Sequence, residues 1–190
     1  MIGAGTEMDD LVARHLRACE GFTAAVEAVG DRWWSSTPCL EWDARALVEH
    51  VIGFHDVLLL RPLWLKPQRP KINTVARWTV TVAATATGLQ GTGRADVVAV
   101  PGMGSMKLGK LVPMLTSDVL VHTWDLAKAL GVPTSLDPDL ATSAYEDALK
   151  NVGRIEASGL FDPPVPVDEN ADVVTKLVAL LGRDPDWPVP

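Results

Sequence analysis

Apolar residues recur every three or four positions along several long stretches of the chain, which is the spacing of one face of an α-helix. In the first stretch, residues 9–29, the apolar positions at this spacing are Leu11, Leu16, Cys19, Phe22, Ala25 and Val26. Gly30 follows, and glycine commonly ends a helix. The pattern therefore predicts a helix over residues 9–29. Residues 33–42, which are rich in Trp, Ser and Pro, are predicted to form a loop.

A second helix is predicted from Asp43 to about Leu60. Aspartate is a favoured N-cap because its carboxylate accepts hydrogen bonds from the free N–H groups of the first helical turn. Pro62 cannot continue the helix, because proline lacks a backbone N–H and its ring clashes with the preceding turn. Residues 62–70 contain further prolines and are predicted to be a non-helical connection.

Residues 72–89 carry two conflicting signals. The alternation of Thr and Val at 79–82 is typical of a strand, because β-branched side chains pack well on a pleated surface. The length of the segment without a turn residue, and the alanines that follow, favour a helix instead. We therefore predict a helix over 72–89. Residues 95–100 form a short β-like run, which indicates an edge strand or an extended segment.

The rest of the chain continues the helical pattern. It predicts a Gly- and Met-rich loop at 101–110, a helix at 111–130, a helix at 137–158, an extended proline-rich strap at 163–166 and a short helix at 171–181. Asp137 is a suitable N-cap, and Pro138 occupies the first helical position, which proline favours. The fold class expected is all-α in the main, as one domain over residues 1–190, with a short extended segment and extra C-terminal helices.

Three polar side chains interrupt apolar faces of the predicted helices: His50, Asp118 and His122. Asp118 and His122 are four positions apart and lie one above the other on the same helical face. A buried carboxylate without a partner costs several kcal/mol, and a divalent cation removes that cost by binding it together with two imidazoles. The coincidence on two helices favours a metal site, although a histidine in an apolar stripe is more often a hydrogen-bonded core residue. Two imidazoles and one carboxylate suit zinc and also match the facial triad of iron(II), with nickel(II) as a further alternative.

The other polar candidates are assigned lesser roles. Asp125 follows His122 by three positions and shares its face, so it is expected either to orient a metal ligand or to be an ordinary surface charge. His55 is five positions from His50 and falls on a different side of the helix, which makes it a poor co-ligand. His15 lies beside arginines and is expected to be solvated.

The cysteines and one glycine-rich segment offer weaker candidates. Cys19 falls on the apolar face of the first helix, and Cys39 is a candidate nucleophile without an assignable base. For both, a small buried hydrophobic residue is the preferred interpretation. Residues 104–111 nearly match a phosphate-binding loop, but Leu111 replaces the hydroxyl residue that would bind Mg²⁺. The segment is therefore interpreted as a flexible lid or wall.

Charge and composition exclude several classes of partner. The net charge of −7 argues against nucleic acid, because phosphate binding needs clustered Lys and Arg. No apolar run reaches membrane-spanning length, and the first residues lack the layout of a signal peptide. Two cysteines in 190 residues favour a reducing compartment. We expect a cytoplasmic protein, monomeric or homodimeric, without a nucleic-acid or membrane partner.

Three segments carry a family resemblance: residues 37–43, residues 47–51 and residues 118–127. With the C-terminal motifs at 163–167 and 182–187, they resemble actinobacterial relatives of the mycothiol-dependent maleylpyruvate isomerase, in a compact metal-binding subgroup. The resemblance implies a DinB-like four-helix bundle and a divalent metal, with His50, Asp118 and His122 matching the family's ligand positions.

The sequence departs from the isomerase in two respects. Position 118 is Asp where the isomerase has Glu, which shortens that ligand by one methylene. The isomerase also carries an additional C-terminal domain with a catalytic arginine, for which these 190 residues leave no room. The metal site is therefore better supported than the isomerase reaction.

Three protein ligands leave at least one coordination position open, as in catalytic zinc sites, and a thiol bound there would be deprotonated. The function expected is a mycothiol-dependent transferase or isomerase that acts on small electrophiles, with a small-molecule thiol and an electrophile as partners. The alternative is a non-enzymatic metal- or thiol-binding module with a stress or regulatory role. No catalytic side chain is assigned.

Overall fold

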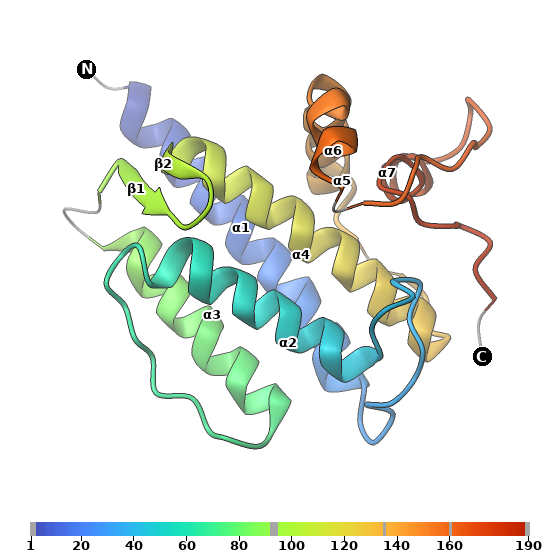
Figure 1. Cartoon of the computed structure of the whole chain (residues 1–190), viewed down its shortest axis with the longest axis horizontal. Coiled ribbons are helices and arrows are strands. Elements are labelled where there is room, and N and C mark those ends of the chain that lie inside the picture. Colours follow the sequence, from blue (N-terminus) through green and yellow to red (C-terminus); the bar gives the residue numbers. More distant parts are fainter. Residues whose placement is uncertain (1–2, 92–94, 135, 160, 189–190) are drawn as a thin grey trace.

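The computed structural model describes residues 3–91, 95–134, 136–159 and 161–188, and these are mainly helical (Figure 1). The elements in chain order are α1 (Gly3–Ala28), α2 (Ala44–His55), the π-helical segment η1 (Asp56–Leu60), α3 (Thr74–Gln90), β1 (Val97–Val100), β2 (Gly104–Lys107), α4 (Leu108–Leu130), α5 (Pro138–Lys150), α6 (Val152–Ser158) and α7 (Val173–Leu180). The prediction of a mainly all-α fold is confirmed.

Helix ends are set by the capping residues that the sequence indicated. The Asp43 carboxylate accepts a 2.8 Å hydrogen bond from the backbone N–H of Ala46 at the start of α2. Asp137 accepts hydrogen bonds from two backbone N–H groups at the start of α5. The segment predicted as a helix at 72–89 is helical over Thr74–Gln90, and within it the hydroxyl groups of Thr79 and Thr81 donate to carbonyl oxygens one turn earlier. Their β-branched side chains thus do not prevent α3 from forming.

The prediction of a loop at 101–110 is confirmed for residues 101–103, which form a turn, and is wrong for residues 104–110. Residues Gly104–Lys107 form β2, which pairs antiparallel with β1 from Val97↔Lys107 to Val100↔Gly104. The turn uses Gly102 at φ +77° and Gly104 at φ +74°, a backbone region that glycine adopts without strain. α4 begins directly after β2, three residues earlier than predicted. A two-stranded antiparallel hairpin is not the parallel-sheet context of a phosphate-binding loop.

The helix predicted at 137–158 is divided in two. Asn151 lies between α5 and α6 with φ −117° and ψ 11°, outside the helical region. Its side-chain amide donates a 2.8 Å hydrogen bond to the carbonyl oxygen of Asp147. Asparagine competes with helical hydrogen bonding in this way, which explains the break. The last helix, predicted at 171–181, is shorter in the structure: it is α7 (Val173–Leu180), with Asp172 as its N-cap.

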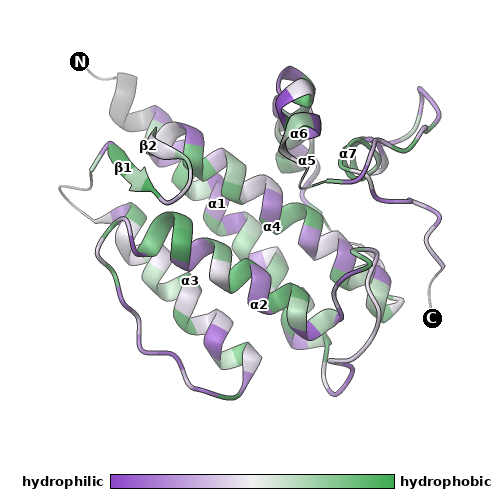
Figure 2. Ribbon diagram, viewed as in Figure 1, coloured by the Kyte–Doolittle hydropathy of each residue, from purple (hydrophilic) through white to green (hydrophobic). Residues whose placement is uncertain are grey.

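Helices α1 to α4 pack around a common core. α1 contacts α3 and α4, and α2 contacts the same two helices, so each of the four lies between two neighbours. Helices α5, α6 and α7 lie beyond α4, on the side away from α3 (Figure 1). Hydrophobic and hydrophilic residues alternate along the helices, as expected for helices with one buried and one exposed face (Figure 2). None of the described helices is both long and apolar enough to cross a membrane.

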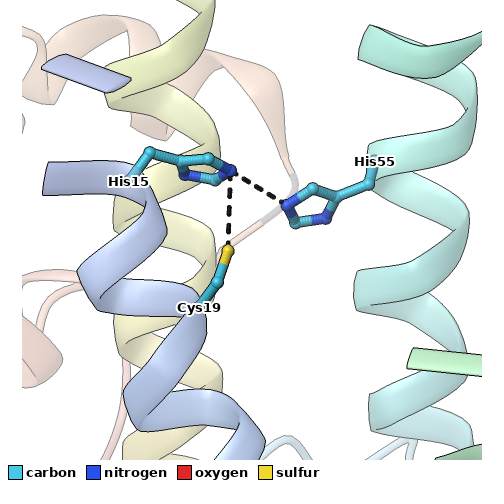
Figure 3. Close-up of side chains that lie close together, drawn as sticks. All are labelled: His15, Cys19 and His55. Atoms are coloured by element: carbon cyan, nitrogen blue, oxygen red, sulfur yellow. Dashed lines mark hydrogen bonds between the residues drawn. The ribbon is translucent and has the colours of Figure 1, made fainter. Parts of the chain in front are cut away.

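The expectation that His15 is solvated is wrong. His15 is 0% exposed and lies on the face of α1 that it shares with Cys19, one helical turn away, rather than on the arginine-rich side. It contacts Thr116 of α4 and His55 at the end of α2 (Figure 3). The i, i+4 relation to Cys19, a residue already assigned to the apolar face, is the sequence signal that indicates burial.

Candidate metal centre

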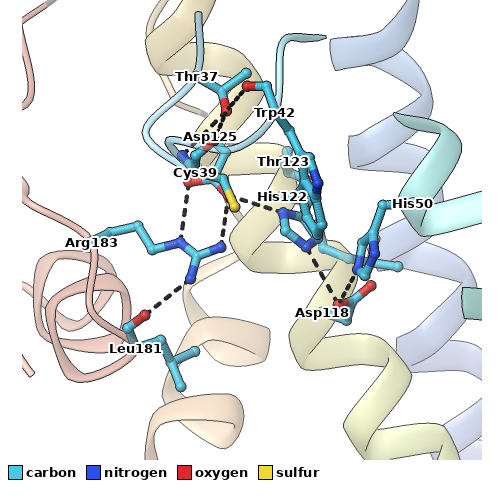
Figure 4. Close-up of polar contacts among 11 residues, drawn as sticks. Thr37, Cys39, Trp42, His50, Asp118, His122, Thr123, Asp125, Leu181 and Arg183 are labelled. Carbon is cyan, nitrogen blue, oxygen red and sulfur yellow. Dashed lines mark hydrogen bonds and ion pairs between the residues drawn. The ribbon is translucent and has the colours of Figure 1, made fainter. Parts of the chain in front are cut away.

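The structure brings together the three side chains that the sequence selected as metal ligands (Figure 4). His50 comes from α2, and Asp118 and His122 come from α4. The Nε2 atoms of His50 and His122 lie 3.5 Å and 3.4 Å from the same oxygen, Asp118 Oδ1. One donor atom from each residue lies within 4.8 Å of the other two. The group could therefore hold a metal ion.

The three side chains of the group differ in exposure. The side chain of His122 is 5% exposed and that of Asp118 is 14% exposed, whereas that of His50 is 27% exposed. The burial follows from the position of α4, which packs against α1, α2 and α5 and therefore has few solvent-facing residues. His50 is therefore the most exposed of the three side chains.

One oxygen of Asp118 indicates that the group fits a cation. Asp118 Oδ2 is buried and has no hydrogen-bond partner among the described residues. An unpaired buried carboxylate oxygen is destabilising, whereas a carboxylate bound to a metal ion needs no further donor. The donor set of two imidazoles and one carboxylate is that of many catalytic zinc and iron(II) sites. The residues present fit a divalent metal.

Asp125 fixes the orientation of His122 from the side opposite to Asp118. Asp125 Oδ2 lies 2.9 Å from His122 Nδ1, so this nitrogen carries a hydrogen and Nε2 remains directed at Asp118. Asp125 is 0% exposed, and the interpretation of it as an ordinary surface charge is wrong. An imidazole held by a carboxylate through its distal nitrogen is the usual arrangement behind a metal-binding histidine.

Sequence reasoning missed the partner of Asp125. Arg183 donates from Nη2 to Asp125 Oδ2 at 3.1 Å and from Nε to Oδ1 at 3.4 Å, and from Nη1 to the carbonyl oxygen of Leu181 at 3.0 Å. The guanidinium thus compensates the charge of a fully buried carboxylate. Helical periodicity gives no indication of this pair, since 58 residues separate the partners. The only sequence signal is that Arg183 belongs to the C-terminal motif at 182–187.

Trp42 was also missed as part of the group. Its ring stacks on the ring of His50, with centroids 4.2 Å apart and an interplanar angle of 29°. The hydroxyl of Thr37 lies 2.8 Å from the carbonyl oxygen of Trp42 and holds this part of the loop in place. Trp42 and Thr37 both lie in the first segment that carried the family resemblance. The loop therefore covers one face of His50.

The carboxylates shift the pKa of His122 upwards. Burial alone lowers the pKa of His122, but the charge of Asp118 and the hydrogen bonds from His122 to Asp118 and Asp125 raise it to about 9. Burial alone raises the pKa of Asp118, whereas the charge of His122 and hydrogen bonds from both histidines lower it well below its usual range. Without a cation, His122 and Asp118 thus form a buried ion pair.

Neither cysteine has the properties of an activated nucleophile. Cys39 is half-buried, and burial raises the pKa of its thiol to about 11 although Arg183 acts in the opposite direction. Cys19 is fully buried, and burial raises the pKa of its thiol to about 12. Both thiols remain protonated at neutral pH, and a thiol is a poor nucleophile compared with a thiolate.

Comparison with known proteins identifies two relatives. No family model matches the chain, and no solved structure matches it significantly. Two proteins of Mycobacterium tuberculosis, described as uncharacterized proteins MT0763 (strain CDC 1551 / Oshkosh) and Rv0738 (strain ATCC 25618 / H37Rv), are each 32% identical to it, over 93% of this chain and 98% of the relative. The chain belongs to the family of Rv0738 and MT0763. The names of these relatives state no activity, so the function of the family must be inferred from the site itself.

Proposed function

We propose that this member of the Rv0738 family is a metal-binding helical protein with a DinB-like bundle, in which His50, Asp118 and His122 hold one divalent ion. The proposal rests on the contacts of Asp118. Two imidazole Nε2 atoms converge on its Oδ1 atom, and its Oδ2 atom is buried without a partner among the described residues. Zinc suits this donor set best, with iron(II) and nickel(II) as alternatives.

The site has room for an external ligand in its coordination. Asp125 is engaged by His122 and Arg183, so the described residues supply three donors rather than four. Three protein donors are typical of catalytic sites, in which a water molecule or a substrate completes the coordination. We place the approach of such a ligand at His50, the most exposed of the three side chains, whose ring stacks with those of Trp42 and Phe54.

The external ligand that we propose is a low-molecular-weight thiol. A divalent ion of this class lowers the pKa of a bound thiol, so that the thiolate is available at neutral pH. The thiol is external in this proposal, because neither Cys39 nor Cys19 belongs to the group formed by His50, Asp118 and His122. The resemblance in segments 37–51 and 118–127 implies that this thiol is mycothiol, which would make the protein a transferase or an isomerase for small electrophiles.

The metal site is tested by elemental analysis of the purified protein. Replacement of His122 by Ala should lower the metal content by about one equivalent per chain, because the most buried ligand is lost. Circular dichroism should show a helix content close to that of the wild type. A Cys39→Ser variant serves as the control and should retain its metal. Equal metal content in the wild type and in His122→Ala would refute the proposed site.

The thiol is tested on cobalt-substituted protein. Addition of mycothiol should produce or strengthen a thiolate-to-cobalt absorption band in the wild type and in Cys39→Ser, but not in His122→Ala. If a panel of small electrophiles is then consumed faster than by mycothiol alone, the protein is an enzyme. A mycothiol-dependent band without acceleration identifies a thiol-binding module instead. No response to mycothiol from a metal-loaded protein would remove the thiol from the proposal.

A further inference from the structure

A second group of metal-ligand side chains lies in the core between α1 and α2 (Figure 3). It consists of His15 and Cys19 of α1 and His55 at the end of α2, and each of the three is 0% exposed. His15 Nε2 lies 3.2 Å from His55 Nε2 and 3.7 Å from Cys19 Sγ. None of these residues contributes a donor to the first site, so the two groups are chemically separate.

The outer nitrogens of both rings are already engaged. His55 Nδ1 lies 2.8 Å from the carbonyl oxygen of Val51, which can only accept, so Nδ1 carries the hydrogen. His15 Nδ1 lies 3.1 Å from Thr116 Oγ1, and the Thr116 hydroxyl donates to the carbonyl oxygen of Val112 at 2.8 Å. The Thr116 oxygen therefore accepts from His15 Nδ1. In both rings the inner nitrogen, Nε2, is left with its lone pair.

Two lone pairs thus face each other at 3.2 Å in the interior. Burial lowers the pKa of His15 to about 3. Burial also lowers the pKa of His55, although the carbonyl oxygen of Val51 and the charge of Asp118 act in the opposite direction. Neither ring therefore carries a second proton at neutral pH that could lie between them. A cation at this point would convert the repulsion of two acceptors into coordination, and the outer hydrogen bonds would orient both rings for it.

We propose that His15, Cys19 and His55 form a second metal site, which takes one thiophilic d¹⁰ cation, Cu⁺ or Zn²⁺, through two imidazole nitrogens and a thiolate. On binding, the S–H bond of Cys19 breaks, a sulfur–metal bond forms and the proton passes to solvent, with no change of oxidation state. Nitrogen and sulfur donors select these ions over Mg²⁺ and Ca²⁺, which require oxygen. This inference does not depend on the proposed function.

Burial favours Cu⁺ over Zn²⁺ in this position. One thiolate and one monovalent cation sum to zero charge, whereas Zn²⁺ leaves a net positive charge in an environment where the three donors are 0% exposed. Cu⁺ also accepts two or three soft donors, so the three side chains can satisfy it. The negative charge of Asp118 acts on both His15 and His55, which favours a cation of either kind.

The two cysteines of the chain permit a clean test. Reduced full-length protein, kept in a phosphine reductant without any added thiol, is loaded with Co²⁺ as a probe for Zn²⁺. A thiolate-to-cobalt band should appear in the wild type, in His122→Ala and in Cys39→Ser, and should be lost in Cys19→Ser. The band in Cys39→Ser can only come from Cys19, so this result does not require that any Cys19 variant folds. Persistence of the band in His122→Ala separates the second site from the first.

Cu⁺ is tested on the same proteins by competition with a colorimetric Cu⁺ chelator under nitrogen. About one equivalent should be withdrawn from the chelator by the wild type and by Cys39→Ser, but not by Cys19→Ser. Because the donors are buried, the metal is added to folded protein and also during refolding from urea. Binding of either ion through Cys19 supports the proposal. If neither ion binds through Cys19, the proposal is wrong.

Discussion

At the scale of single residues, Asp125 joins the candidate metal centre to the C-terminal part of the chain. Its carboxylate accepts from His122 on one side and from Arg183 on the other, and no part of it is exposed. The two interactions serve different ends: the first orients a ligand, and the second compensates a buried charge. A change at this position should therefore affect metal affinity and stability together.

Replacement of Asp125 by Asn should weaken metal binding about 10- to 100-fold, because the neutral amide holds His122 less firmly. It should also destabilise the fold by about 3–5 kcal/mol, since Arg183 loses its buried counter-charge. Chelator competition measures the first effect and urea unfolding the second. The matched control is Asp56→Asn, which breaks ion pairs with Arg61 and Arg69 outside the site. Equal metal affinity in the two variants would contradict the role assigned to Asp125.

The sequence was informative about residues whose relation is local. Asp118 and His122 are one helical turn apart, so their shared face follows from spacing alone. The prediction for His15 was wrong because its i, i+4 relation to the buried Cys19, and not the neighbouring arginines, indicates its environment. Arg183 could not be found by any local pattern, because its partner Asp125 is brought to it only by the tertiary fold.

At the scale of elements, helix boundaries were predictable wherever a capping residue determines them. Asp43 and Asp137 cap helices that begin where expected. The β1–β2 hairpin was not predicted, because Gly104–Lys107 has no alternation of apolar and polar residues and is a strand only through its pairing with β1. The break at Asn151 was missed for a similar reason, since a single asparagine inside a periodic pattern does not by itself end a helix.

The turn after α7 places Arg183, and Gly182 makes this turn possible. Gly182 has φ +79°, and a Cβ atom there would lie 2.5 Å from the carbonyl oxygen of Asp162. Gly182→Ala should therefore destabilise the protein by more than the 1–2 kcal/mol or so of left-handed strain alone, and should weaken metal binding by displacing Arg183 from Asp125.

The matched control for this prediction is Gly21→Ala in the middle of α1. A Cβ there meets nothing within 4 Å, so alanine should stabilise the helix by roughly 1 kcal/mol through its higher helix propensity. Urea unfolding of both variants, with metal content measured in parallel, decides the matter. If Gly182→Ala is as stable as Gly21→Ala, the turn does not have the steric role assigned to it.

At the scale of the whole molecule, all four histidines of the chain lie in two groups between α1, α2 and α4. His122 responds to protons in the opposite way to His15 and His55. His122 is held in its charged form by two carboxylates, whereas His15 and His55 are held neutral chiefly by burial. The pH dependence of the metal-free protein should therefore distinguish them.

Stability of the metal-free protein should fall as the pH decreases from 6.5 towards 5. The pKa of His15 is about 3 in the folded state and 6.5 in the unfolded chain. As the pH falls, the unfolded chain therefore binds a proton before the folded protein does, and the free energy of unfolding decreases. One such histidine contributes a slope of up to about 1.4 kcal/mol per pH unit. The raised pKa of His122 contributes stability that is already complete below pH 6.5 and is lost only as the pH rises towards 9. The lowered pKa of Asp118 matters only near and below 3.8. The range from 6.5 to 5 therefore isolates the buried pair.

Urea unfolding of chelator-treated protein at several pH values measures this slope directly. In His15→Gln the slope should decrease by up to about 1.4 kcal/mol per pH unit, the contribution of one proton, because the titrating ring is gone. This decrease is expected even though the variant is less stable than the wild type at pH 7. Cys39→Ser is the control: the pKa of the Cys39 thiol is about 11, so its removal should leave the slope between pH 6.5 and 5 as in the wild type. A free energy of unfolding that stays constant over this range, or a slope that His15→Gln does not change, would show that the interior accommodates a charged imidazole.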